Sequence, residues 1–569
     1  MLPGRFLKAL AVVVVMIAAA PLCYILLRAV QAPAAAWFGV WNSQLPRLFA
    51  GSVRYAAATM GIAALLGFGL AWLVERTDLP GQRTWRWLLA MPLAMPAYVS
   101  ALCYILLLRR GGITERAYMA VTGAPLGVLP AADIYSLGGA ALVTALCVYP
   151  YVFLPVSAAL RGGSRTLEEA ARMLGCGGAG AFVRVTLPLV APMLLGGTLL
   201  VGMYALSDFG TVSMLRYRTF TVAIYNQFAG QVDRSAAAVL SLVLIALTAP
   251  LLAGESLLAR RGRRLSVGAV DHEPAPIPLG RGRAPATAMV AFVAAAALGV
   301  PTTVLAGLSI SGWLAPTQVD QIWSVGSDAT WRHGLNSVLL AAAAATMATA
   351  AALAPALLAT RAPGRITTLL LAIGRSSNVL PGMLIGLALI LLFNRMLPLL
   401  YGTWAALAIG LALRLLPQSM TTNEGALRAA SPLLEQAACA LGARRLQIFQ
   451  RITLPVARRG IMAGWLLAFV AAMKELPLAV LLRPPGFDTL PVRIWAAASE
   501  SVYTQAAPAA LLLLACTAIP LVLLTADGDR SSIHNQHNRH NRPHATLENP
   551  ATHAATTPTQ MAHRRRTRS

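Results

Sequence analysis

Runs of about 20 apolar residues recur along this chain, and each is long enough to cross a membrane as a helix. Six fall in the first half, near residues 7–29, 53–74, 87–108, 136–158, 190–210 and 237–258. Six more fall in the second half, near residues 288–310, 335–358, 367–393, 403–420, 460–482 and 505–525. With 57% hydrophobic residues, the chain is more apolar than a soluble domain. The sequence therefore predicts an all-α, polytopic membrane protein with about twelve transmembrane helices.

One signature occurs twice in the chain. Glu168 begins the sequence EEAARMLG, with VTLP further on, and Glu435 begins EQAACALG, followed by ITLP. Pro455 follows Pro188 by the same number of residues as Glu435 follows Glu168, so neither copy has an insertion between these positions. A constant offset of this kind indicates two tandem copies of one membrane module. We expect a first transmembrane domain at 1–258, a linker at 259–287, a second transmembrane domain at 288–525 and a disordered cytoplasmic tail at 526–569.

The formal charge of +25 is distributed in short segments between the apolar runs. The arginines do not follow one amphipathic face, so the charge argues against a protein that binds nucleic acid. Arginine-rich loops mark the cytoplasmic side of a membrane protein. By this rule both signature loops and both termini lie in the cytoplasm. An even number of helices in each half then makes the repeats parallel, related by an axis along the membrane normal.

Each signature loop is predicted to hold a short helix of acids and alanines that ends at a glycine. Small residues allow the backbone of a partner to approach closely, acids suit a helix start, and glycine accepts a positive φ. We expect this helix to insert into a cleft on another protein, and the alternative is a helix that contacts only membrane lipid. The residues concerned are Glu168, Glu169, Ala170, Ala171 and Gly175 in the first copy, and Glu435, Gln436, Ala437, Ala438 and Gly442 in the second.

The spacing of EAA, glycine and Leu-Pro in these loops is similar to the coupling-loop signature of permease subunits of binding-protein-dependent ABC importers. The motif ends at Pro188 in the first copy and at Pro455 in the second. The resemblance implies a permease of a bacterial inner membrane whose loops contact two copies of a cytoplasmic ATPase subunit. It also implies a periplasmic binding protein that delivers the substrate. Gln436 stands where the first copy has Glu169, so we expect the two loops to contribute unequally.

Two further segments, Ser207 to Phe228 and Lys474 to Trp495, resemble the iron(III) importer permeases. This resemblance implies iron(III) as the substrate, with thiamine or another small solute as the alternative. A secondary transporter with parallel repeats is the rival class. Such a transporter needs ionisable pairs at mid-membrane, and the chain offers little beyond Arg375, Arg414 and Lys474.

The energy source is predicted to lie outside this chain. Its only lysines, Lys8 and Lys474, precede Ala9 and Glu475, so no GxxxxGK[ST] phosphate loop is possible. A separate subunit must therefore bind ATP, and we expect this chain to hold no cofactor and to catalyse no reaction. The six cysteines are scattered and have the pattern of small buried hydrophobic residues.

Asp208 and Glu475 are equivalent by the offset of the signature and are the candidate residues of a translocation path. Asp208 lies about 18 residues into its helix, or roughly 27 Å, and so near the outer mouth. Carboxylates are costly at membrane depth and suit a hard trivalent cation. The alternative is a local pair, as between Glu475 and Lys474. No metal site is assigned, and low-complexity sequence explains the tail histidines, which are His534, His537, His540 and His544.

Overall fold

The computed structural model describes residues 5–123, 125, 133–162, 165–230, 233–266, 276–314 and 328–540. Within these residues the regular structure is helical, apart from one isolated parallel bridge between Thr77 and Ile277. Residues up to Val522 form one compact unit, and residues from Leu523 onward form a second. Everything below concerns the first unit unless the tail is named.

The first half contains α1 (Arg5–Val30), α2 (Ala34–Ser43), α3 (Leu45–Arg76), α4 (Gln82–Ala90), η1 (Met91–Ala94), α5 (Ala97–Leu108), α6 (Ile113–Thr122), α7 (Leu137–Val148), α8 (Pro150–Arg161), α9 (Arg165–Met173), α10 (Gly178–Ala181), η2 (Phe182–Thr186), α11 (Leu187–Ser207), α12 (Gly210–Met214), α13 (Phe220–Tyr225), η3 (Asn226–Gly230) and α14 (Arg234–Ser266).

The second half contains η4 (Gly280–Gly282), α15 (Arg283–Ala294), η5 (Ala295–Gly299), α16 (Val300–Leu314), α18 (Asp328–Arg361), α19 (Arg365–Arg375), η6 (Ser376–Val379), α20 (Gly382–Met396), α21 (Trp404–Ala429), α22 (Pro432–Ala440), α23 (Arg445–Ile448), η7 (Phe449–Thr453), α24 (Leu454–Met473), α25 (Pro477–Leu482), α26 (Leu490–Ser499) and α27 (Tyr503–His540). In order, α3 to α5 correspond to α18 to α20, and α7 with α8 corresponds to α21. The run α9 to α14 corresponds to α22 to α27.

Eight described helices are long and apolar enough to cross a membrane, and two bent pairs raise the number to ten. This is below the roughly twelve that the apolar runs predicted. The expected span 367–393 is divided between α19 and α20, and α20 has only 15 residues. The expected span 403–420 lies in α21, which also carries Arg414, Glu424 and Arg428. Charged side chains of this kind are rare in a lipid-facing helix.

Both halves break a helix at an equivalent proline. Met95, before Pro96, has φ −82° and ψ 121°, and Leu380, before Pro381, has φ −85° and ψ 115°. A proline drives the preceding residue out of the α region, which ends each helix there. In the first half the bend reaches 92°. As a result, α5 and α20 begin inside the molecule and are almost wholly buried.

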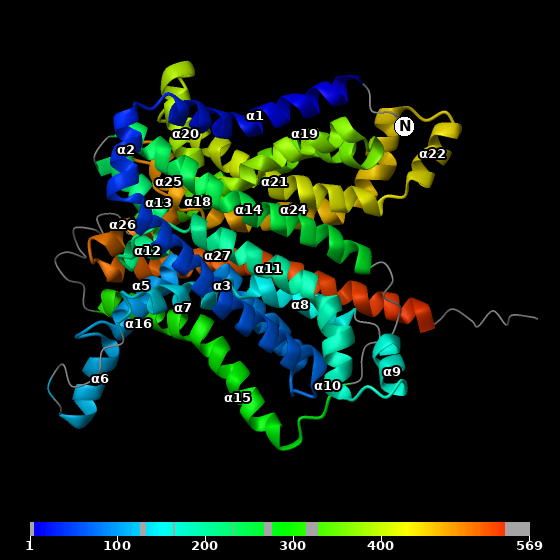
Figure 1. Ribbon diagram of the computed structural model, residues 1–569, viewed down its shortest axis with the longest axis horizontal. Helices are drawn as coiled ribbons and strands as arrows, with labels where there is room; N and C mark the ends of the chain where they lie inside the picture. The colour runs from blue at the N-terminus through cyan, green and yellow to red at the C-terminus, as the bar shows by residue number, and fades with distance from the viewer. Residues whose placement is uncertain are drawn as a thin grey trace, which may run out of the picture. The chain divides into compact units, whose positions relative to one another are not determined.

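The first helix of each half packs on the other half. α1 contacts α18, α19 and α20, and Figure 1 shows it alongside α19. In return, α15, η5 and α16 contact α4, α5 and α7. The Tyr104 hydroxyl of α5 donates to the Ala296 carbonyl at 2.6 Å. Because of this exchange, the two repeats share one large core cluster, and the expected division at 258 and 288 stays a prediction about sequence repeats.

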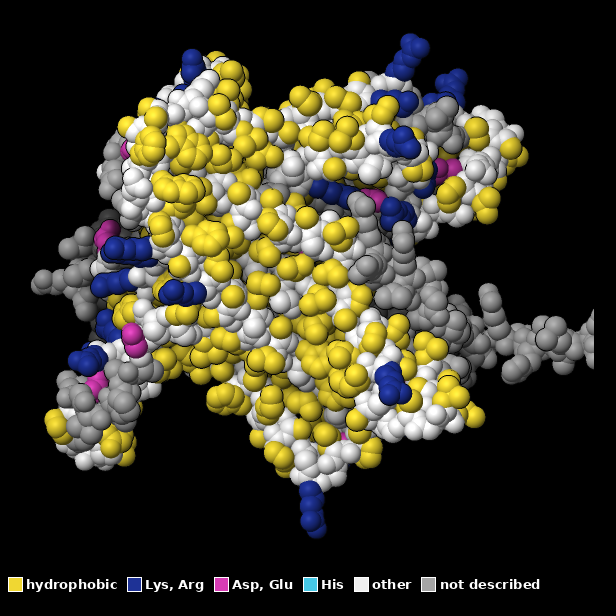
Figure 2. Space-filling model, viewed as in Figure 1, with side chains coloured by type: hydrophobic (Ala, Val, Ile, Leu, Met, Phe, Trp, Pro, Cys, Tyr) yellow, Lys and Arg dark blue, Asp and Glu magenta, His cyan; other side chains and the backbone are white. Residues whose placement is uncertain are grey.

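The two signature helices, α9 and α22, lie at the same end of the molecule, at the right of Figure 1. The short helices α12, α13, α25 and α26 lie at the opposite end. α11 connects the two ends over 21 residues, or about 31 Å at 1.5 Å per residue. On the face in view, Figure 2 shows hydrophobic side chains over the region between the ends, with most charged side chains near the ends. This is the arrangement of a protein whose middle faces lipid.

The start of the tail is helical, whereas the sequence predicted disorder from residue 526. α27 continues as a helix to His540, and it contains His534 and His537. Extending an existing helix is easier than starting one, and Pro543 is the first strong helix breaker beyond this end. Residues 541–569, including His544, lie outside the described residues.

Candidate functional site

Each signature loop folds as a short helix that ends at a glycine. Gly175 follows α9 with φ 85°, and Gly442 follows α22 with φ 84°. The amide of Cys176 donates to the Ala171 carbonyl at 3.0 Å, and the second loop repeats this bond at 3.0 Å. This is the Schellman ending, whose left-handed residue is usually glycine. A Cβ atom at either glycine would have no heavy atom within 4 Å, so both glycines border open space.

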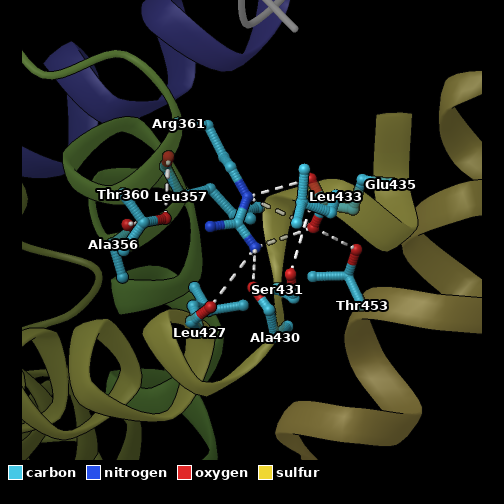
Figure 3. Close-up of polar contacts among 10 residues, drawn as sticks. All are labelled: Ala356, Leu357, Thr360, Arg361, Leu427, Ala430, Ser431, Leu433, Glu435 and Thr453. Carbon is cyan, nitrogen blue, oxygen red and sulfur yellow. Dashed lines mark hydrogen bonds and ion pairs between the residues drawn. The ribbon is translucent and has the colours of Figure 1, made fainter. Parts of the chain in front are cut away.

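In the second loop, the first acid is bound inside its own half (Figure 3). Arg361, the last residue of α18, forms an ion pair with Glu435 at 2.7 Å between Nη2 and Oε1. The Thr453 hydroxyl donates to the same Oε1 at 2.8 Å. Arg361 also donates to the Leu427 and Ala430 carbonyls at 3.2 and 3.1 Å. We call Arg361, Glu435 and Thr453 the second-loop cluster.

The first loop has the same arrangement. Arg76, the last residue of α3, forms an ion pair with Glu168, and the Thr186 hydroxyl donates to Glu168 at 2.7 Å. We call Arg76, Glu168 and Thr186 the first-loop cluster. In both halves the first acid of the signature therefore connects the loop helix to the helix before it and to the segment after it. Glu168 and Glu435 are thus turned inward, and a role of these two residues in contact with a partner stays a prediction.

The outer faces of α9 and α22 are exposed and apolar. The second position of the signature points outward in both loops, at Glu169 and at Gln436, and Ala170 and Ala437 beside it are also exposed. Large apolar side chains surround these positions with exposures of 51 to 88%, at Leu167, Met173, Leu174, Leu433, Leu434 and Leu441. Ala171 and Ala438 are half-buried, and Pro188 and Pro455 are exposed at the starts of α11 and α24. Exposed apolar side chains that gather on one surface suit contact with a protein or with membrane lipid, the two alternatives for these helices.

Asp208 lies directly after α11, at the end far from the signature loops. Its Oδ2 accepts from the Tyr55 hydroxyl at 2.9 Å, and its Oδ1 accepts from the Thr211 amide at 3.1 Å. Tyr55 in turn shares a hydrogen bond of 2.7 Å with Thr144. Both carboxylate oxygens thus bind groups of the first half, as the alternative of a local structural pairing expected.

Glu475 has a different environment from Asp208. Its Oε1 is buried without a hydrogen-bond partner, and a Cβ on Gly382 would collide with this oxygen. Lys474 does not take the role of local partner that the sequence suggested. Its Nζ donates to the Leu93 carbonyl of η1, in the other half, at 2.5 Å. Among the described residues, no group of three or more His, Cys, Asp or Glu side chains could hold a metal ion.

Comparison with known proteins explains the repeated loops. Residues 63–264 and 349–526 each match the family described as "Binding-protein-dependent transport system inner membrane component". The chain belongs to this family. Each matched segment contains one signature helix and all three residues of one loop cluster. The permease is therefore a transport component with two family repeats in a single multi-pass membrane chain.

Relatives of this permease are named for different substrates. It is 28% identical over 465 residues to the Fe(3+)-transport system permease protein FbpB 2 of Haemophilus influenzae, covering 81% of this chain and 86% of that protein. It is 33% identical over 219 residues to the molybdenum transport system permease protein ModB of Escherichia coli K12, covering 36% and 90%. It is 30% identical over 164 residues to the sulfate transport system permease protein CysW of the same strain, covering 29% and 54%.

Sequence reasoning missed four residues of the loop clusters of this permease. Thr186 and Thr453 were already visible as the shared threonine of VTLP and ITLP, at the offset of the signature. Arg76 and Arg361 are harder to pair, because they are further apart along the chain than this offset. The first half has additional residues between α5 and α7, and these include the extra helix α6. Aligning the helices before the signature separately would have revealed the two arginines.

Proposed function

We propose that this permease forms the translocation path of an ABC importer for iron(III) in a bacterial inner membrane. In this proposal α9 and α22 each insert into one of two copies of a separate cytoplasmic ATPase subunit. A periplasmic binding protein delivers the substrate at the opposite end, where α12, α13, α25 and α26 lie. Both termini are then cytoplasmic. The observation that carries the proposal is that each signature helix is exposed on one face and ion-paired to its own half on the other.

The loop clusters suggest how movement of the ATPase subunits reaches the membrane. Closure of the two ATPase subunits on ATP displaces both signature helices. Glu168 connects its helix to Arg76 on α3 and to Thr186 before α11, and Glu435 makes the equivalent contacts. A displaced loop therefore moves two long helices of its half together. The halves then rock, and the path opens alternately to each side.

Iron(III) is supported by the relative that covers most of the chain, which is named as an Fe(3+) permease. The unpartnered Oε1 of Glu475 is a hard oxygen of the type that a trivalent cation prefers. One observation favours a second candidate, a tetrahedral oxyanion such as molybdate or sulfate. Arg414, in the middle of α21, has a buried Nε without a hydrogen-bond partner, and two other relatives are named for molybdenum and sulfate.

Transport by the reconstituted complex tests the proposal. The permease is purified with its co-isolated subunits, placed in proteoliposomes with its binding protein, and supplied with ATP. Uptake of labelled iron(III), molybdate, sulfate and thiamine is then compared. We expect ATP-dependent uptake of iron(III) alone. Uptake of molybdate or sulfate without iron(III) would replace the substrate with an oxyanion, and uptake that persists without any ATPase subunit would refute the coupling proposal.

A further inference from the structure

Three aromatic side chains from the two halves meet at the end far from the signature loops. Phe209 precedes α12, Tyr225 ends α13, and Trp495 lies in α26. The ring centroids of Phe209 and Tyr225 are 4.9 Å apart, and those of Phe209 and Trp495 are 6.0 Å apart. Tyr225 and Trp495 meet edge to face, with centroids 6.2 Å apart. These separations are within the range of favourable aromatic pairs.

The helices α13 and α26 are equivalent elements of the two repeats. The amide of Phe220, at the start of α13, donates to the Ser52 hydroxyl at 3.1 Å. The amide of Leu490, at the start of α26, donates to the Ser337 hydroxyl at 2.7 Å. These serines lie in α3 and α18, which end at Arg76 and Arg361. The two serines are separated by the same number of residues as the two arginines. The start of α13 is therefore bound to α3 in the same way as the start of α26 is bound to α18.

Tyr225 is the fifth residue after Phe220, and Trp495 is the fifth residue after Leu490, so the two rings occupy equivalent positions. Two equivalent residues of a two-fold arrangement can touch only near its axis. The separation of 6.2 Å between the two centroids therefore places both rings close to that axis. For parallel repeats the axis runs along the membrane normal, between the halves. In the function proposed above, on which this inference rests, the path runs between the halves along the same line.

The packing around the three rings leaves little space between the halves. A Cβ on Gly210, next to Phe209, would lie 2.9 Å from the Leu476 side chain and 2.9 Å from the Tyr98 side chain. Leu476 belongs to the second half and is equivalent to Phe209 by the offset of the signature. The residues next to the axis at this end are thus large, apolar and in contact.

We propose that Tyr225 and Trp495, with Phe209 against both rings, close the translocation path at its extracytoplasmic end. Rocking of the halves separates the pair, because each ring belongs to a different half. Trp495 also has an indole Nε1 that is buried without a hydrogen-bond partner. An unpaired buried donor destabilises the closed form, and water reaches it when the rings part. The ring pair therefore closes the path to small ions, and it can open again when the halves move.

Leakage of a small ion through the permease alone tests this closure without any partner or transported substrate. The full chain is reconstituted into liposomes loaded with labelled rubidium ions, and efflux is measured. We expect the Tyr225→Ala/Trp495→Ala double variant to leak at least about tenfold faster than the unsubstituted chain. Tenfold corresponds to about 1.4 kcal/mol, which the loss of these aromatic contacts can supply. The Tyr225→Phe/Trp495→Phe double variant keeps both rings and should remain tight.

Two further variants keep the test decisive. Phe292→Ala truncates an aromatic side chain of α15 that is 73% exposed, and it should not leak. Trp495→Leu is a milder change, used if the double alanine variant does not fold, and it should leak more than Phe292→Ala. The proposal is overturned if neither Trp495→Leu nor the double alanine variant leaks. It is equally overturned if the double phenylalanine variant leaks as fast as the double alanine variant.

Discussion

The first two positions of each signature differ in exposure, because the first faces inward and the second faces the surface. Glu435 is 8% exposed inside the second-loop cluster, while Gln436 beside it is exposed. Neighbouring residues of an α-helix point about 100° apart, so the residue after one that faces inward is turned toward the surface. The inward position is Glu in both loops, at Glu168 and Glu435, and the outward position differs. The internal contact is therefore the same in the two halves, and any asymmetry between the loops belongs to the outer face.

The inward acid should matter for stability and its neighbour should not. We expect Glu435→Gln to lower the free energy of unfolding by about 1–3 kcal/mol, because Arg361 loses its charged partner inside the protein. Gln436→Ala, one residue further along, should change it by less than about 0.5 kcal/mol. Thermal unfolding of the detergent-purified chain measures both. Equal shifts for the two variants would show that the ion pair does not stabilise the loop.

The two path candidates should respond differently to loss of charge. Asp208→Asn replaces one carboxylate oxygen by an amide nitrogen, so the Tyr55 hydroxyl loses its charged acceptor and must turn its proton toward Thr144, at a cost of about 1–3 kcal/mol. Glu475→Gln removes a charge whose Oε1 has no hydrogen-bond partner, and glutamine can still accept the backbone hydrogen bond from Leu478, so we expect a smaller loss of stability than for Asp208→Asn. If Glu475 lines the path, its variant should lower iron(III) uptake while the complex still assembles. The opposite stability order, with Glu475→Gln the weaker protein, would contradict this division of roles.

At the scale of elements, the sequence predicted the glycines that end α9 and α22, because glycine accepts a positive φ. It did not predict the breaks before α5 and α20, since the expected spans 87–108 and 367–393 run across Pro96 and Pro381. The sequence did not reveal that α7 and α8 bend by 44° at Tyr149, whereas their counterpart α21 is one continuous helix with Pro417 inside it. A proline inside a helix can bend that helix or leave it nearly straight, and packing against neighbouring helices decides which occurs.

Backbone strain and contact with the ATPase can be separated at the glycine ends. Gly175→Ala should lower the free energy of unfolding by about 1–2 kcal/mol, because φ is 85° there. Gly177→Ala is the matched control, since its φ of −62° suits alanine and no heavy atom lies within 4 Å of its Cβ position. Gly175→Arg adds bulk toward the partner and should abolish ATP-dependent uptake although the chain still inserts. Normal uptake by a Gly175→Arg/Gly442→Arg variant would remove the coupling role of these loops.

At the scale of the whole molecule, the sequence predicted the class and the two repeats, but not the exchange of first helices. Apolar runs identify spans because a spanning helix must be apolar. They do not identify neighbours, because every face of such a helix is apolar and lipid is as apolar as a neighbouring helix. The sequence therefore assigned α1 to the first repeat, and the structure packs it on α18, α19 and α20 of the other repeat as well as on α14 of its own.

This exchange predicts how the chain behaves when it is cut between its halves. Residues 1–266 and 276–569, expressed as two separate polypeptides, should assemble and copurify, since each first helix binds the other half. The Leu279 amide also donates to Asp78 at 2.8 Å, which connects the start of the second half to the first. Either polypeptide expressed alone should be degraded or aggregate, because the surfaces that α1 and α16 cover would be exposed. Affinity purification through a tag on one polypeptide, with detection of the other, measures assembly.

Removal of α1 provides the control for this experiment. The pair of residues 31–266 and 276–569 keeps the other contacts between the halves but leaves the faces of α18, α19 and α20 that contact α1 uncovered. We expect its copurification to fall well below that of the intact pair, and addition of a peptide of residues 1–30 to the membranes to restore part of it. If residues 1–266 alone gave a stable, monodisperse protein, or if removal of α1 left assembly unchanged, the exchanged helix would not be what joins the halves. The connection would then depend on the contacts of α15, η5 and α16 with α4, α5 and α7, of α26 with α5 and of α14 with η6, and on the aromatic pair near the axis.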